Sequence, residues 1–347
     1  MRPSNFLLPG LTAISFLGFS PSALADGREP GSLLIFPEFD NRTANVTMFT
    51  VTNTNTDFVH NPATNLPNGT VKVHFIYVGR VDASGATIPC LENNFETTLT
   101  PGDTFTFLTR THNPNQSQGF MFAYAKHPTT NVPITFDYLI GNALFLNGTV
   151  AIDYSTNPVS LEGRTGAGNP TDVDSDGNRD LNGQEYEAMP DQIMIPRFLA
   201  STGVLRSELV MLGLSGGALF DTTFDFSIYN DSEEKFSAQR VVRCWERTPL
   251  DVISNQFTQT FLGGVLSQNP NEPLGASGRE SGWILIDSTL ASSGPETILN
   301  PAIYAVLVER VSRGAGAADL PFEYGYTNYG SLWPNGPNGD NGPADGY

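Results

Sequence analysis

The sequence is poor in charge, histidine and cysteine. Only 16% of its 347 residues are charged, and 18 basic residues stand against 36 acidic ones. A net charge of −18 repels nucleic acid and anionic membranes, so we expect neither as a partner, and it favours cations or neutral ligands. The hydrophobic fraction of 39% is large enough to fill a core, which argues against a disordered acidic chain.

Long hydrophobic runs are also lacking after the N-terminus, so no membrane helix is predicted. The first 25 residues combine a short positive start, a 14-residue apolar run (FLLPGLTAISFLGF) and small residues at Ala23 and Ala25. This pattern predicts a signal peptide over residues 1–25 and export to the periplasm or the cell exterior. Cleavage removes Arg2 and no acid, leaving 17 basic against 36 acidic residues.

The two cysteines are Cys90 and Cys244. In an oxidising compartment an even pair predicts a disulfide. Neither cysteine has a second cysteine or a histidine nearby at ligand spacing, so we do not expect them to bind a metal.

Helical periodicity is also scarce, and β-type segments separated by turn residues take its place. A first series runs from SLLIFPEF to VPITFDYLIGNALFL, and a second begins near residue 191 with QIMIPRF and ends with NPAIYAVLVER. Branched and aromatic residues dominate both series, as is typical of half-buried strands.

The two series share landmarks in the same order, which predicts an internal duplication. The matched pairs are IFPEF 35–39 with MIPRF 194–198, HFIYV 74–78 with FSIYN 226–230, Cys90 with Cys244, GFMFAY 119–124 with GWILID 282–287, and NVPITF 131–136 with NPAIYA 300–305. If the two parts pack about a pseudo-twofold axis, the cysteines could face each other across it.

We therefore predict an all-β chain with two related β-sandwich domains, immunoglobulin-like or jelly-roll-like. The expected divisions are a signal peptide 1–25, domain 1 at 26–155, an acidic connector 156–189, domain 2 at 190–325 and a flexible tail 326–347. A single large barrel is the alternative, but VKVHFIYV is apolar on both faces, which suits packed sheets better.

The connector contains the segment TDVDSDGNRDLNGQEYE, residues 171–187, with alternating carboxylates. Its D-x-D-x-D-G pattern resembles the calcium loops of EF-hands, dockerins and thrombospondin-type repeats over about a dozen residues. The resemblance implies a structural calcium ion bound by Asp172, Asp174, Asp176, Asn178 and Asp180, with Glu185 or Glu187 completing the shell. A solvated acidic linker is the alternative.

The segment departs from an EF-hand at two places. Arg179 stands where an aliphatic residue is usual, and Gly183 stands where a bidentate glutamate closes the shell. No flanking helices are predicted, so the segment is not expected to be an EF-hand.

Signals for catalysis are weak. Gly213-Leu-Ser215-Gly-Gly217 matches a nucleophile motif, but a β segment follows it and all four histidines lie upstream. We expect a chance match at a turn. Carboxylates suited to glycoside hydrolysis cannot be singled out from the sequence.

The overall pattern resembles exported bacterial proteins built from β-sandwich repeats. It implies a non-catalytic structural, adhesion or ligand-binding protein whose partner is a protein or glycan at the cell surface. The alternative is a secreted carbohydrate-active enzyme or carbohydrate-binding protein, since exposed aromatics such as Trp333 in the tail can stack on sugar rings.

Overall fold

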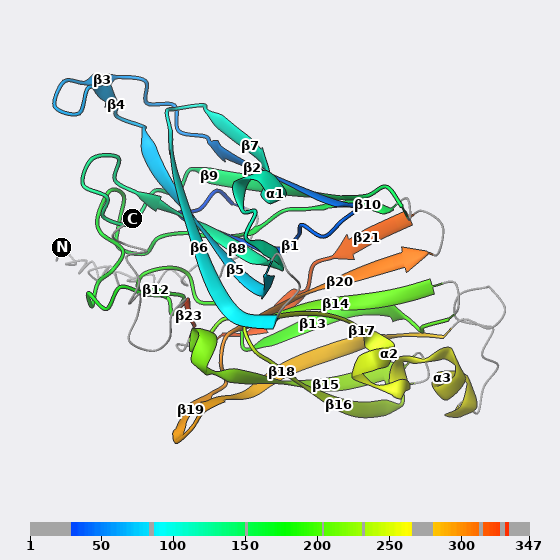
Figure 1. The fold of residues 1–347 in the computed structure, drawn as a ribbon. Coiled ribbons are helices and arrows are strands. Elements are labelled where there is room, and N and C mark those ends of the chain that lie inside the picture. The colour runs from blue at the N-terminus through cyan, green and yellow to red at the C-terminus, as the bar shows by residue number, and fades with distance from the viewer. Residues whose placement is uncertain are drawn as a thin grey trace, which may run out of the picture.

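The computed structural model describes residues 29–82, 87–149, 152–202, 205–230, 233–265, 280–311, 315–326 and 330–332. The predicted signal peptide, and most of the predicted tail including Trp333, lie outside these residues. The described chain is mostly antiparallel β structure, as predicted (Figure 1). Within the described residues, no helix has the length and apolar character needed to cross a membrane.

The N-terminal part of the chain forms a first sandwich of two sheets. One has the order β11 (Val159–Leu161), β1 (Leu33–Asp40), β8 (Gln116–Lys126), β5 (Val71–Asp82), β6 (Thr87–Leu99). The other has the order β10 (Ile152–Thr156), β9 (Leu139–Asn147), β2 (Asn45–Asn53), β7 (Thr104–Leu108). Alternate residues of both sheets, among them Phe36, Phe49 and Phe75, form the first core.

The C-terminal part forms a second sandwich. One sheet has the order β16 (Lys235–Val242), β15 (Asp221–Asn230), β18 (Ser281–Ser293), β13 (Gln192–Leu199), β22 (Phe322–Gly325), with β19 (Glu296–Leu299) on β18. The other has the order β17 (Trp245–Pro249), β14 (Leu205–Gly213), β20 (Ile303–Val311), β21 (Ala315–Asp319). Ile195, Phe226 and Leu307 belong to the second core between them.

The remaining elements are short. They are the strand pairs β3 (His60–Asn61) with β4 (Leu66–Pro67) and β12 (Arg179–Asp180) with β23 (Ser331–Leu332), the helices α1 (Thr109–His112), α2 (Leu250–Ile253) and α3 (Gln259–Val265), and the 3₁₀ turns η1 (Gly217–Leu219) and η2 (Asn255–Phe257).

The two sandwiches have corresponding strand orders, because β11-β1-β8-β5-β6 matches β22-β13-β18-β15-β16 and β10-β9-β2-β7 matches β21-β20-β14-β17. Even an irregularity recurs. The register of β1 shifts between Phe36 and Phe39, and that of β13 shifts between Ile195 and Phe198. Pro37 and Pro196 lie inside these two bulges, where a residue without an N–H is tolerated.

A pair of glycines identifies corresponding positions in the central strands. A Cβ on Gly119 would lie 2.1 Å from the Val78 carbonyl oxygen, and one on Gly282 would lie 2.0 Å from that of Tyr229. The strand pairing therefore equates Val78 with Tyr229, which differs by one residue from the motif match of HFIYV with FSIYN. Since neighbouring residues of a strand face opposite sides, Tyr77 is buried in the first core while Tyr229 faces outward.

Two other predicted matches are wrong in detail. NVPITF precedes β9, whereas NPAIYA runs into β20, and the ladders equate Leu139 with Ile303. The cysteines are not equivalent either, because Cys90 lies in β6 and Cys244 lies between β16 and β17. They are nevertheless bonded to each other, which confirms the predicted disulfide.

A third apolar cluster, the junction core, joins the sandwiches. It includes Ile35 and Phe122 from the first sandwich and Val210 and Val306 from the second, all at most 2% exposed. Burial of each such side chain stabilises by roughly 1.5–3 kcal/mol, so this is a firm interface. It also explains why VKVHFIYV is apolar on both faces, since β5 lies between the first core and the junction core.

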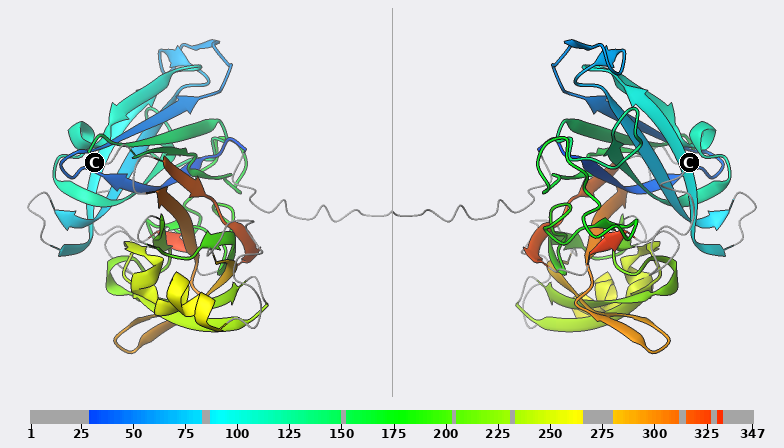
Figure 2. Two further views of the ribbon diagram at one scale, coloured as in Figure 1. Left: turned by 90° about the vertical axis from the view of Figure 1, so that its right-hand side faces the viewer. Right: turned by 90° about the vertical axis from the view of Figure 1, so that its left-hand side faces the viewer.

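The sheets consequently stack in four layers (Figures 1 and 2). The junction brings the sheet of β1 in the first sandwich against the sheet of β14 in the second, and these are not corresponding sheets. The two sandwiches therefore stack head to tail, and the pseudo-twofold packing considered from the sequence is not the one adopted.

Candidate metal site

The acidic segment between β11 and β13 is folded against the junction and is not a solvated linker. Leu181, Tyr186 and Met189 are completely buried in the junction core. The short strand β12 pairs with β23, and the Tyr186 hydroxyl lies 2.9 Å from the Thr171 hydroxyl. The segment thus has a fixed conformation set by apolar anchors on its C-terminal side.

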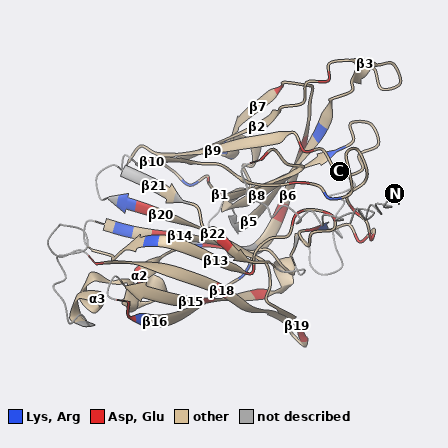
Figure 3. Ribbon diagram, turned by 180° about the vertical axis from the view of Figure 1, so that it is seen from behind, with Lys and Arg blue, Asp and Glu red and all other residues tan. Residues whose placement is uncertain are grey.

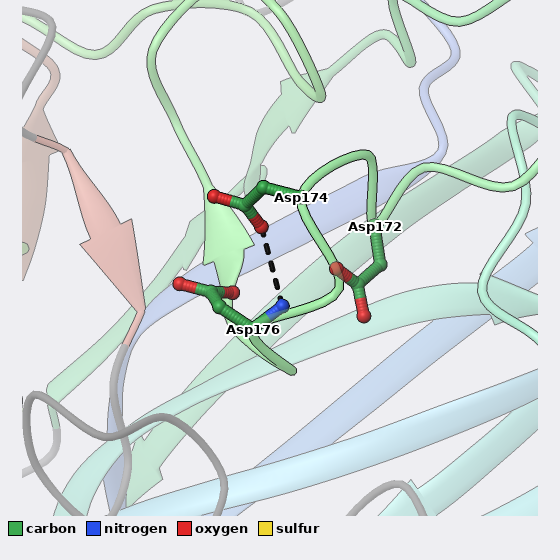
Figure 4. Close-up of side chains that lie close together, drawn as sticks. All are labelled: Asp172, Asp174 and Asp176. Atoms are coloured by element: carbon green, nitrogen blue, oxygen red, sulfur yellow. Dashed lines mark hydrogen bonds between the residues drawn. The ribbon is translucent and has the colours of Figure 1, made fainter.

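Three aspartates lie together at the tip of this segment. Oxygen atoms of Asp172, Asp174 and Asp176 all lie within 4.8 Å of one another (Figure 4). The chain curls because Ser175 and Gly177 have positive φ angles of 62° and 84°. Glycine adopts this conformation readily, which explains its place in the motif.

Hydrogen bonds within the tip hold the carboxylates. The Asp176 amide donates to Asp174 Oδ1 over 3.3 Å (Figure 4). The Asn178 amide donates to Asp176 Oδ1 over 2.8 Å. Three carboxylates this close repel one another, and a hard cation such as calcium prefers carboxylate oxygens. The group can therefore hold a metal ion.

The other predicted ligands have different surroundings. Glu185 is buried, and its two oxygens accept hydrogen bonds from the amides of Val173 at 2.5 Å and Asp180 at 3.1 Å. Burial raises the pKa of Glu185 to about 7, against the lowering effect of these two bonds. The Glu185 carboxylate therefore joins two parts of the segment by binding their backbone amides. It lies outside the group of three aspartates.

Asp180 also lies outside that group. Asn178 is buried and its Nδ2 donates to Asp176 Oδ2 over 2.6 Å, so it positions a carboxylate. The Asp180 carboxylate accepts a bond from Asn182 Nδ2 at 3.2 Å. Glu187, the alternative to Glu185, accepts a hydrogen bond from the Glu162 amide and pairs with Arg164.

Arg179, the unusual eighth residue of the motif, has a role that the sequence did not reveal. Its guanidinium lies 4.8 Å from the Tyr124 ring centre on β8, and its Nη2 donates to the Gly177 carbonyl over 2.6 Å. Arg179 therefore ties the aspartate tip to the first sandwich.

The serine of the G-x-S-x-G motif makes a buried hydrogen bond to the backbone of a neighbouring segment. Ser215 is buried, and its hydroxyl accepts a hydrogen bond from the Ala302 amide over 2.9 Å. The 3₁₀ turn η1 and then β15 follow it, so the strand-to-helix turn that a hydrolase nucleophile needs is not formed.

A cavity of about 470 Å³ between the sandwiches was not foreseen from the sequence. It is lined by Arg42 and by residues from β1, β2, β8, β9 and β10 on one side, and by residues from β14, β17 and β20 on the other. One available signal beside the cavity was the charged residue Glu38 inside the apolar segment IFPEF.

No protein-family model matches this chain, and no curated protein sequence matches it.

Proposed function

We propose that this chain is an exported, non-catalytic structural, adhesion or ligand-binding protein in which a calcium ion orders the segment between two related β-sandwich domains. The observation that carries the proposal is the convergence of Asp172, Asp174 and Asp176. The Cys90–Cys244 disulfide supports the export part, because disulfides persist in oxidising compartments.

Calcium suits this site better than magnesium. It accepts six to eight oxygens in irregular arrangements, whereas magnesium demands a near-ideal octahedron. Extracellular modules of this kind bind with dissociation constants of about 0.1–1 mM. Occupancy would then add only about 1 kcal/mol of stability, enough to order the segment.

The test is calorimetric titration of calcium into the chain without residues 1–25, beside Asp174→Asn/Asp176→Asn. A matched control, Asp153→Asn/Glu296→Gln, removes two exposed carboxylates elsewhere. We expect saturable binding in the wild type and the control, lost in the aspartate variant, and calcium protection of residues 160–190 against proteolysis. Unchanged binding by the aspartate variant, or no binding at millimolar calcium, would refute the site.

The cavity favours sugar binding as a second candidate function, because aromatic rings and polar groups line it together. Hydrolysis is less well supported. Glu38 accepts hydrogen bonds from Tyr154 and Arg247, and both oxygens of Glu208 bind arginines. Carboxylates engaged in this way are poor proton donors to a substrate.

A further inference from the structure

The junction cavity has the dimensions of a small-molecule site. Its volume of about 470 Å³ falls within the usual range of roughly 300–1,000 Å³ for ligand pockets. It lies where the two sandwiches meet, beside the Trp245 indole, whose Nε1 donates to the Pro37 carbonyl over 2.9 Å. The walls are thus fixed by contacts of both sandwiches and do not need to form on binding.

The polar wall is built on two arginine–carboxylate clusters. Arg247 Nε donates to Glu208 over 2.7 Å and its Nη1 donates to Glu38, so one guanidinium joins the two sandwiches. Burial opposes the charge of Arg247, but its interactions with Glu38 and Tyr154 together outweigh burial and raise the pKa of Arg247. On the other wall Arg42 binds both oxygens of Asp40.

Arg310 shares its carboxylate partner, Glu208, with Arg247. Arg310 lies directly opposite Arg206 in the ladder of β14 and β20, and like charges so placed repel each other. Figure 3 shows basic segments side by side on these strands. Burial, together with repulsion from Arg206 and Arg42, lowers the pKa of Arg310.

The charges in and beside the cavity leave a surplus of one. The lining residue Glu246 is paired with Arg240 and adds no net charge. The other arginines are Arg42, Arg206, Arg247 and Arg310, and the other carboxylates are Glu38, Asp40 and Glu208. A singly charged anion balances this surplus. Arg310 donates only from Nη2 among the described residues, so its remaining N–H groups can bind a planar carboxylate.

The rest of the lining suits a ring that carries hydroxyl groups. The Phe145 and Tyr154 rings are stacked, with centroids 4.6 Å apart, and present an aromatic surface to the cavity. Amides of Asn45, Asn147 and Gln118 supply donors and acceptors on the same wall. Aromatic surface beside neutral amides is the combination that sugar rings use.

We propose that this cavity binds a carboxylated sugar of one or two rings, with the carboxylate on Arg310 and Arg42 and the ring against Tyr154 and Phe145. The inference rests on the ligand-binding part of the proposed function and names its ligand class. It does not depend on calcium, because the aspartate tip shares no residue with the cavity.

The test is calorimetric titration of glucuronate and of galacturonate into the protein. Glucose and inorganic phosphate are titrated separately as comparison ligands. Arg42→Gln removes a cavity guanidinium whose side chain is 53% exposed, and the matched control Arg243→Gln removes one that is 42% exposed and pairs with Asp221. Gln118→Glu adds one negative charge to the wall without removing an ion pair.

We expect a uronate to bind saturably and glucose far more weakly. Arg42→Gln and Gln118→Glu should each weaken uronate binding at least about tenfold, while Arg243→Gln and Asp174→Asn/Asp176→Asn leave it unchanged. Absence of uronate binding at about 10 mM would overturn the proposal, as would equal binding of glucose, preferential binding of phosphate or indifference to both cavity variants. Absence of calcium binding by the wild type, with intact uronate binding, would refute the metal site alone.

Discussion

The Trp245 indole and the Pro37 carbonyl form a hydrogen bond between residues 208 positions apart. The bulge in β1 makes it possible, because the register shift between Phe36 and Phe39 takes the Pro37 carbonyl out of the ladder with β8. The indole comes from β17, directly after Cys244, so the bond and the disulfide fix the same edge of the junction.

Trp245→Phe should destabilise the protein by about 1–3 kcal/mol, because it leaves the Pro37 carbonyl without its donor at a buried position. Urea denaturation measures the loss. Trp283→Phe is the control: Trp283 is 37% exposed and stacks on Tyr229, so its loss should cost under about 0.5 kcal/mol. Equal losses in the two variants would contradict the role given to this bond.

The buried His74 should make stability fall in mild acid. Burial, aided by the Lys126 charge, lowers the pKa of His74 to about 4, against the raising effect of its hydrogen bonds to the Asn94 and Glu96 side-chain oxygens. The unfolded chain binds a proton near pH 6.5 and the folded chain does not, so stability is lost as pH falls from about 6.5 towards 4.

Urea midpoints at pH 7 and pH 5 measure this loss in a window above the range where most carboxylates titrate. In His74→Gln the difference between the two midpoints should shrink. It should not vanish, because burial also lowers the pKa of His112 to about 4. An unchanged difference would show that His74 does not set the acid response.

The outer face of the first sandwich should resist self-association because it is hydroxylated. Thr50 and Thr52 correspond by strand pairing to Val210 and Leu212, which are buried in the junction core. Their hydroxyls pair with those of Thr106 and Thr104 at 3.0 Å and 2.9 Å. The first sandwich therefore carries a polar surface where the second carries an apolar one.

Thr50→Val/Thr52→Leu should make the protein associate as its concentration rises, which sedimentation velocity detects. The new apolar surface lacks an intramolecular partner, and such patches drive association. Thr223→Val on β15 is the control and should remain unassociated. A monodisperse double variant would show that hydroxyl groups do not limit association here.

The strands and the disulfide were predictable from sequence because local signals set them. Branched and aromatic runs bounded by turn residues indicate β1, β5 and β8, and an even cysteine pair beside a predicted signal peptide indicates the bond. The direction of stacking was not predictable. It depends on which outer face of each sandwich is apolar. The motif match places Tyr77 and Tyr229 at the same position, but the strand pairing displaces them by one residue, so that the side chains of β15 assigned from the match face the wrong side of the sheet.

The aspartate tip was predictable for similar reasons, since alternate carboxylates and Gly177 are a local pattern. Glu185 was harder to assign. Sequence spacing made it a possible ligand, but its oxygens bind the amides of Val173 and Asp180 in the folded segment. The cavity required residues far apart in the chain, such as Tyr154 and Arg247, and no short motif contains both.

The head-to-tail junction leaves the molecule with two different outer faces. One end presents paired threonines and the other presents the sheet of β15, so the two ends offer different chemistry to whatever they meet. In such an arrangement a further copy of the sandwich would be accommodated at the junction, between the existing two, with both end surfaces kept. Length and end chemistry would then vary independently of each other.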